Sequence, residues 1–169
     1  ISKKTLYQYF NTKAELVESI MLNHLNSEKD MCCNLVNEVE NAIDQLHEIF
    51  KFNMQMMRSI NPSTIFELRK YYPSVWKHFD QHKNQVIYHS VLENLKLGQK
   101  QGLYRTDLDP EIISRLYTGR MELIVDGETF PTTKFSFLQI MKELFIYHIR
   151  GIASEKGIKH LETSQSYFE

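Results

Sequence analysis

Residues 1–16 read ISKKTLYQYFNTKAEL, and this stretch predicts the end of one short helix, a tight break and the start of a second helix. Leu6 and Phe10 are four residues apart, so they share one face of the first helix. Thr12 and Glu15 have the T-x-x-E spacing of a capping box, which is typical of a helix start. The stretch therefore predicts a junction between two helical units.

The first thirteen residues are basic. They contain Lys3, Lys4 and Lys13 and no acid, so the rest of the chain carries a net charge of −4, against −1 for the whole. Lys4 and Thr5 fall on the helix face opposite Leu6. A small basic, hydroxyl-rich helix ahead of a mildly acidic body indicates a nucleic-acid-binding element joined to a second unit.

The composition and the hydrophobic pattern predict an all-α protein. Hydrophobic residues make up 42% of the 169, and 6 Gly and 4 Pro are few for a sandwich or barrel. Long segments follow a 3.6-residue period, and none alternates convincingly as a strand. The only cysteines, Cys32 and Cys33, are adjacent, so we expect reduced thiols and a cytoplasmic protein. Charged residues interrupt the apolar stretch at 135–152, so no membrane span is expected.

The segment S-K-K-T-L-Y-Q-Y-F-N-T-K-A-E-L resembles the end of the DNA-binding domain of the TetR family of bacterial transcriptional repressors. That family ends its recognition helix with S-x-x-T-L-Y-x-Y-F and opens the following helix with K-x-x-L. The tract G-L-Y-R-T-D-L-D-P-E, residues 102–111, resembles the loop that the family commonly has before its second-last helix. The family has two helices ahead of the recognition helix, so the chain is expected to be N-terminally incomplete.

The resemblance implies a TetR-like helical bundle with a defined division of the chain. The expected parts are the end of a helix-turn-helix domain at 1–11, a connecting helix at 12–33, a ligand-binding and dimerisation domain at 34–157, and a C-terminal tail at 158–169.

Local signals place the remaining helices. Pro73 is expected to begin a long helix that ends at Gly102, the C′ residue. Gly157 is expected to end the last helix, with a polar, frayed segment from Glu155 onward. The expected helices after the connecting helix are 41–60, 62–72, 73–101, 110–127 and a last one from about 135.

The same resemblance implies roles for the basic helix. Lys3, Lys4 and Thr5 would face the major groove, while Tyr7, Tyr9 and Lys13 would hold phosphates on either side. The family usually has a small residue where this chain has Lys4, so Lys4 would contact either a base or only a phosphate.

Aromatic, methionine and polar side chains in the body are candidates for a small-molecule cavity, because such sites are mostly apolar with a few polar groups. The alternative is that the methionines only fill the core. The candidates are Asn53, Met54, Met57, Phe66, Trp76, Phe79, His82, Tyr88, His89, Tyr117 and Met121.

Three histidines share a helix face at a spacing that can chelate a metal: His78, His82 and His89. No cysteine or carboxylate of a second helix is implicated by the sequence. We therefore expect a solvated polar face, with no metal and no cofactor, and a metal sensor is the less favoured alternative.

The last two expected helices are apolar around most of their circumference, so each must bury two faces. A two-fold partner can cover the second face, and in the TetR family these helices form a four-helix dimer interface. The alternative is burial within one bundle. The interface candidates are Ile113, Leu116, Leu123, Leu138, Met141, Leu144, Phe145 and Ile149.

The chain has no Gly-rich phosphate loop, no G-x-S-x-G and no H-E-x-x-H, so an enzyme is not expected. The leading hypothesis is a homodimeric, ligand-responsive transcriptional regulator, a repressor that a small molecule releases from its double-stranded DNA operator. The alternative is a helical dimerisation or interaction module without a small-molecule effector.

Overall fold

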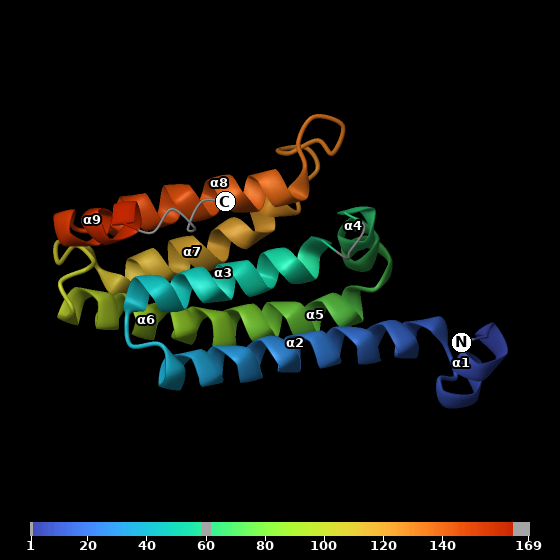
Figure 1. Ribbon diagram of the computed structural model, residues 1–169. Coiled ribbons are helices and arrows are strands. Elements are labelled where there is room, and N and C mark those ends of the chain that lie inside the picture. The colour runs from blue at the N-terminus through green and yellow to red at the C-terminus, as the bar shows by residue number, and fades with distance from the viewer. Residues whose placement is uncertain (1, 59–61, 164–169) are drawn as a thin grey trace.

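The computed structural model describes residues 2–58 and 62–163, which form an elongated helical bundle (Figure 1). These residues contain no strand, and their one isolated bridge joins Tyr104 to Ala153. The elements are α1 Lys3–Tyr9, α2 Lys13–Glu38, α3 Ala42–Arg58, α4 Pro62–Tyr71, α5 Pro73–His82, the π-helical turn η1 Lys83–Ile87, α6 Tyr88–Lys100, α7 Pro110–Ile124, α8 Phe137–Ile152 and α9 Glu155–Thr163. The predicted all-α class is confirmed.

The junction between α1 and α2 has the caps that the sequence predicts. The Ser2 hydroxyl accepts the Thr5 N–H at 3.1 Å and caps α1. The Thr12 hydroxyl accepts the Glu15 N–H at 3.1 Å, and the Glu15 carboxylate accepts the Asn11 N–H at 2.7 Å. These bonds satisfy backbone donors that a helix start leaves without partners. Figure 1 shows α1 beyond one end of the bundle and α9 at the other.

The main core lies between α3, α6, α8 and the loop at 103–104. Phe50 of α3 stacks on Phe145 of α8, with ring centroids 4.1 Å apart. Ile43 and Ile149 are fully buried beside this pair. Three helices and the loop thus share one apolar cluster, which fixes their relative positions.

The helix predicted at 73–101 is present, but it is not uniform. Its middle is a π-helical turn, in which the Tyr88 N–H donates to the Lys83 carbonyl five residues back. The helix ends as predicted, with Gly102 at φ +69° and the Leu103 N–H donating 2.9 Å to the Gly98 carbonyl. This is a Schellman ending, for which glycine is the least strained residue.

The prediction that Gly157 ends the last helix is wrong. Residues Glu155–Thr163 form α9, and the Ser154 hydroxyl accepts the Gly157 N–H at 3.1 Å. Gly157 lies inside this helix because its missing side chain lets the helix approach the Leu103 carbonyl, which a Cβ would meet at 2.1 Å. The expected tail from 158 therefore begins inside α9. The connecting helix also continues past 33, to Glu38.

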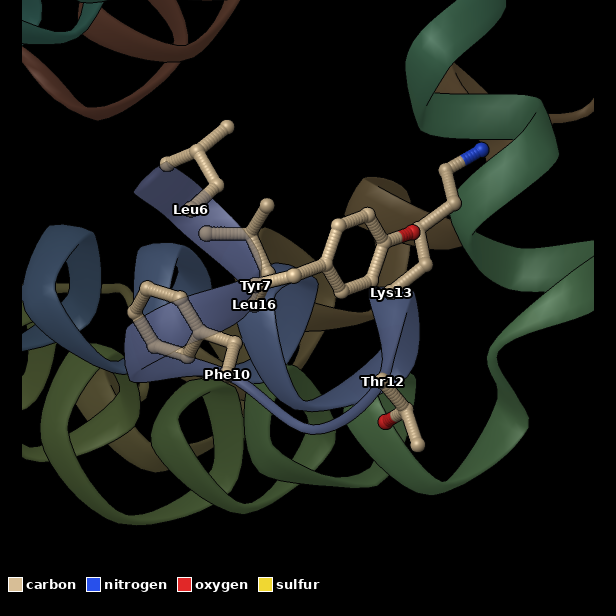
Figure 2. Close-up of a pocket in the computed structure, with 6 residues that line it drawn as sticks. All are labelled: Leu6, Tyr7, Phe10, Thr12, Lys13 and Leu16. Carbon is tan, nitrogen blue, oxygen red and sulfur yellow. The ribbon is translucent and has the colours of Figure 1, made fainter. Parts of the chain in front are cut away.

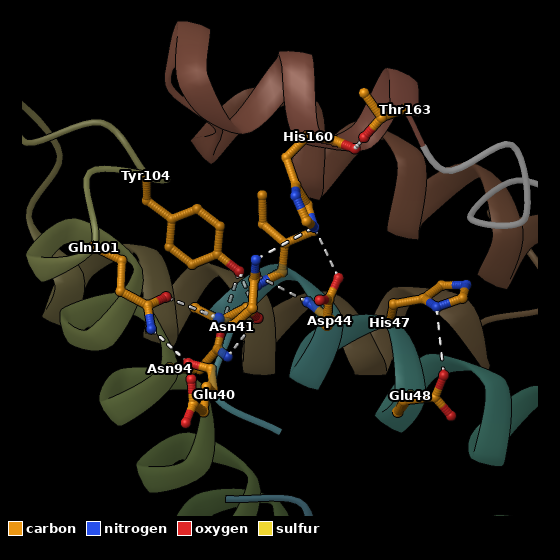
Figure 3. A network of polar contacts seen from close by, with 12 residues as sticks. Glu40, Asn41, Asp44, His47, Glu48, Asn94, Gln101, Tyr104, His160 and Thr163 are labelled. Atoms are coloured by element: carbon orange, nitrogen blue, oxygen red, sulfur yellow. Dashed lines mark hydrogen bonds and ion pairs between the residues drawn. The ribbon is translucent and has the colours of Figure 1, made fainter. Parts of the chain in front are cut away.

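A polar network joins α9 to the turn before α3 (Figure 3). His160 of α9 pairs with Asp44 at 2.9 Å and contacts the Asn41 amide at 3.3 Å. The Tyr104 hydroxyl lies 3.1 Å from both the Ala42 carbonyl and the Asn94 side-chain oxygen. The network therefore fastens the end of the bundle that is remote from α1.

Candidate DNA-binding and ligand-binding sites

Helix α1 turns its predicted DNA-contacting residues away from α2. Lys4 and Thr5 are exposed, and Tyr9 is 76% exposed. Leu6 and Phe10 are half-buried on the other side. The side chain of Lys3 lies outside the described residues. The helix therefore presents a basic and hydroxyl-bearing face to solvent.

An open apolar hollow of about 330 Å³ lies between α1 and α2 (Figure 2). Its walls are Leu6, Tyr7, Phe10, Thr12, Lys13 and Leu16. Tyr7 is thus half exposed and also lines the hollow, while the Lys13 ammonium lies 6.0 Å from the Tyr72 ring centroid of the body. Lys4, Thr5 and Tyr9 are consequently the predicted contacts that are exposed and lie outside the hollow, although the Thr5 hydroxyl lies 2.9 Å from the Ser2 hydroxyl.

The predicted ligand-binding residues are spread over five helices and do not surround one described cavity. Asn53, Met54 and Met57 are half-buried on α3, and Met121 is half-buried on α7. Trp76 and Phe79 of α5 contact each other, with centroids 4.8 Å apart. The side chain of Phe66 lies outside the described residues.

The remaining candidates have partners or face solvent. The Tyr88 ring centroid lies 5.1 Å from the Arg115 guanidinium. His89 is exposed, and its ring meets the Tyr88 ring edge-on. Tyr117 lies between Arg120 and His148. A small apolar pocket of about 10 Å³ opens elsewhere in the body, lined by Ile65, Ile124, Val125, Phe130, Thr132, Phe135, Phe137 and Ile140. None of these residues was among the predicted ones, because the loop at 125–136 folds back in a way that no local pattern specifies.

His78 and His82 do not form a solvated polar face. The His78 Nε2 lies 2.7 Å from a Glu18 oxygen, and the His82 Nε2 lies 3.1 Å from a Glu28 oxygen. Both carboxylates come from α2, which the sequence did not implicate. His82 is buried in this pair, so the structure does not place it in a ligand cavity. Within the described residues no cluster of three or more His, Cys, Asp or Glu could hold a metal ion.

Neither of the two cysteines forms a disulfide, and their surroundings differ. Cys33 is exposed, whereas Cys32 is buried on the α2 face that carries Glu28. Burial, and secondarily the Glu28 carboxylate, raises the pKa of the Cys32 thiol to about 12. Burial and negative charge both disfavour the thiolate, so Cys32 is a poor nucleophile in the folded protein.

A buried histidine lies between α7 and α8. The His148 ring contacts the Tyr117 ring edge-on, with the ring centroids 4.7 Å apart. The Arg120 guanidinium lies 3.9 Å from the centroid of the Tyr117 ring and donates to the Leu144 carbonyl at 3.0 Å. Burial, together with the Arg120 charge, lowers the pKa of His148 to about 3. His148 is therefore neutral at physiological pH.

This low pKa predicts that acid destabilises the fold. In the unfolded chain a histidine takes up a proton near pH 6.5, whereas folded His148 does so only near pH 3, so folding stability is lost as pH falls through this window. Between pH 7.5 and 5.5 this histidine should cost about 1.4 kcal/mol of unfolding free energy. Urea titrations at both pH values should show this loss of unfolding free energy in the wild type and a correspondingly smaller loss in His148→Gln. Equal losses of unfolding free energy in the two proteins would contradict the role of His148.

The predicted dimer residues divide between core and surface. Phe145 and Ile149 are buried in the protomer core, so they are corrected to core residues. Ile113 packs against that core, and Leu138, Met141 and Leu144 are half-buried. Leu116 is 64% exposed and Leu123 is also exposed. The sequence pattern showed that these helices are apolar on two faces, but it did not show which face the protomer covers.

Two exposed apolar residues of this surface were missed. Ile112 lies one turn before Leu116 on α7, and Tyr147 of α8 is 80% exposed. Ile112, Leu116 and Leu123 recur at i, i+4 and i+11, so they form one stripe along α7, which we call the α7 stripe. A Cβ added to Gly119 in this stripe would meet no atom within 4 Å. The α7 stripe is therefore an open apolar surface.

Together, the short basic helix, the long connecting helix and the helical body define an all-α, TetR-like fold. A transcriptional regulator of the HTH type from Bacillus subtilis (strain 168), the uncharacterised YvaF, is 23% identical over 156 residues, which cover 92% of this chain and 81% of the relative. No known family profile matches the chain. No helix among the described residues is long and apolar enough to cross a membrane.

Two solved structures have the same fold. The ketosteroid transcriptional regulator KstR2 of Mycobacterium tuberculosis aligns with a TM-score of 0.60 at 18% identity, over 92% of this chain and 80% of its own. A gamma-butyrolactone receptor, an ArpA-like protein, aligns with a TM-score of 0.61 at 15% identity, over 96% of this chain and 76% of its own. These comparisons confirm the TetR-like fold, and the three matched proteins are described as transcriptional regulators or as a receptor.

Proposed function

We propose that the intact protein is a homodimeric transcriptional repressor that binds an operator through α1 and is released by a small molecule. The observation that carries this proposal is the orientation of α1. Its basic and hydroxyl-bearing residues Lys4, Thr5 and Tyr9 point outward at one end of the bundle, while Leu6 and Phe10 are turned inward. A recognition helix needs this arrangement, because one face must enter the major groove while the other is braced.

The α7 stripe supports the dimeric part of the proposal. A two-fold interface uses the same surface on both subunits, and the stripe offers each subunit an apolar surface without a partner in the protomer. Two copies joined there carry two α1 helices, which must lie about 34–36 Å apart to enter successive major grooves. A ligand that favours another orientation of α2 changes this separation and so releases the DNA.

The test is DNA binding by the full-length protein, using genomic fragments that the protein itself selects. Lys4→Ala should weaken binding and lower the salt dependence by about one phosphate contact, because each neutralised phosphate releases a counterion. Lys29→Ala, an exposed lysine on α2, serves as the control and should bind like the wild type. If Lys4→Ala binds with unchanged affinity and salt dependence, α1 is not the DNA-contacting helix.

One observation favours the alternative of an interaction module without an effector: the body pocket described above holds only about 10 Å³. A ligand present at 100 times its dissociation constant stabilises a protein by about 2.7 kcal/mol. Thermal-shift measurements with a panel of hydrophobic and aromatic compounds should therefore reveal an effector as a raised Tm. A panel that shifts nothing while DNA binding persists would favour a regulator without a small-molecule ligand.

A further inference from the structure

Helices α2 and α5 are tied together by the two histidine–carboxylate pairs. Glu18 and Glu28 are ten residues apart, so the two pairs hold α2 at points separated by about 15 Å along its axis. In the inner pair, the side chains of His82 and Glu28 are only 7% and 11% exposed. Removing one member of such a buried pair leaves the other without a partner, which is strongly unfavourable. Helix α5 therefore cannot move far without taking α2 with it.

The π-helical turn begins directly after the inner pair. It comprises Lys83–Ile87 and separates α5 from α6, which is part of the main core. Kinks in helices concentrate at such turns, because the wider ring of backbone atoms interrupts the regular hydrogen-bond ladder. The π-turn is thus the place where α5 can change direction relative to α6 at the lowest cost.

A salt bridge spans this turn. The buried Lys83 ammonium lies 2.7 Å from a Glu122 oxygen of α7 and 3.3 Å from an Asp80 oxygen of α5. Lys83 therefore connects three elements: α5 before the turn, the turn itself, and α7 in the body. Burial by itself lowers the pKa of Lys83, but the hydrogen bonds that its ammonium donates to the Glu122 and Asp80 carboxylates raise the pKa above its ordinary value, so Lys83 stays charged.

We propose that the π-turn is a hinge about which α5 and α2 swing as one unit, with the Lys83–Glu122 bridge setting its angle from α7. This inference rests on the proposed function, because the swing matters through α1 at the start of α2. The inner pair at Glu28 lies fifteen residues from Lys13, the first residue of α2, so the arm from the hinge to that end is about 22 Å long. A rotation of about 8° therefore displaces the end next to α1 by about 3 Å. A small movement of α7 is thereby amplified at the recognition helix.

The test measures distances within one chain by pulsed electron spin resonance. The full-length protein carries Cys33→Ser and spin labels at Lys100 of α6 and either Gln8 of α1 or Lys77 of α5, all exposed positions. Dilution with excess unlabelled protein leaves at most one labelled chain per assembly. The measurement therefore needs neither a dimer nor DNA, and failure of the proposed function would not affect it.

Two variants distinguish the movement of α5 at the hinge from the connection of α5 to α2. Glu122→Gln releases the bridge and should shift or broaden both distances, by about 3 Å at α1. His82→Gln removes the histidine of the inner, buried pair and so weakens the connection between α5 and α2, while the His78–Glu18 pair remains. It should change only the distance to α1. Glu111→Gln, an exposed acid on the same α7, should change neither. Unchanged distances in Glu122→Gln, or an altered α5 distance in His82→Gln, would overturn the proposal.

Discussion

Gly98→Ala should lower the free energy of unfolding by about 3 kcal/mol or more. An added Cβ would lie 2.0 Å from Cδ2 of Tyr104. That ring is 1% exposed and its hydroxyl is held by the Ala42 carbonyl and the Asn94 side chain. The ring therefore cannot turn aside without breaking the network that fastens α3 to α6.

Equilibrium urea unfolding measures this loss, and Gly151→Ala is the matched control. Gly151 is an exposed residue in the last turn of α8, outside the α7 stripe, and its Cβ would meet nothing within 4 Å. Its replacement should change stability by no more than about 1 kcal/mol, through helix propensity. If both variants lost the same small amount, the packing of Tyr104 against Gly98 would not be the close contact described above.

In the proposed dimer, Leu116→Glu should convert a species of about 40 kDa to a monomer of 20.1 kDa. Leu116 lies in the centre of the α7 stripe and makes little contact with its own protomer, so a glutamate there is solvated in the monomer. In an isologous interface the change brings an unpaired charge from each subunit into an apolar surface, which costs several kcal/mol. The monomer should keep its helical content and lose DNA binding.

Sedimentation velocity at several concentrations measures the change in mass. Ile20→Glu, at a 62% exposed apolar residue of α2, is the matched control and should leave the dimer intact. A Leu116→Glu protein that still sediments as a dimer would place the interface elsewhere. A wild-type protein that is already a monomer would remove the dimeric part of the proposed function.

Caps and turns were predictable from the sequence because each depends on neighbouring residues. Thr12 and Glu15 cap the start of α2, and Gly102 ends α6, as the local spacing indicated. Gly157 shows the limit of this reasoning. A glycine ends a helix or allows close packing inside one, and the choice depends on the Leu103 carbonyl, which is 54 residues away in the chain.

The candidate sites were predictable to a smaller extent. Three histidines at helical spacing were visible in the sequence. The partners of two of them depend on how α2 packs along α5: His78 pairs with Glu18, and His82 pairs with Glu28. Periodicity likewise gave two apolar faces on α8, and only the packed bundle shows that Phe145 and Ile149 belong to the inner one. No sequence pattern marks the π-turn, because one additional residue within a long helix hardly alters the helical pattern of that helix.

The position of Cys32 gives the protein a chemical reporter of its own. The thiol is buried on the face of α2 that carries Glu28, and its raised pKa keeps it protonated there. A thiol reagent reaches it only when this face of α2 separates from the bundle and water enters. In a Cys33→Ser background, the rate at which Cys32 is alkylated therefore counts these opening events in the otherwise native protein, without a probe or a ligand.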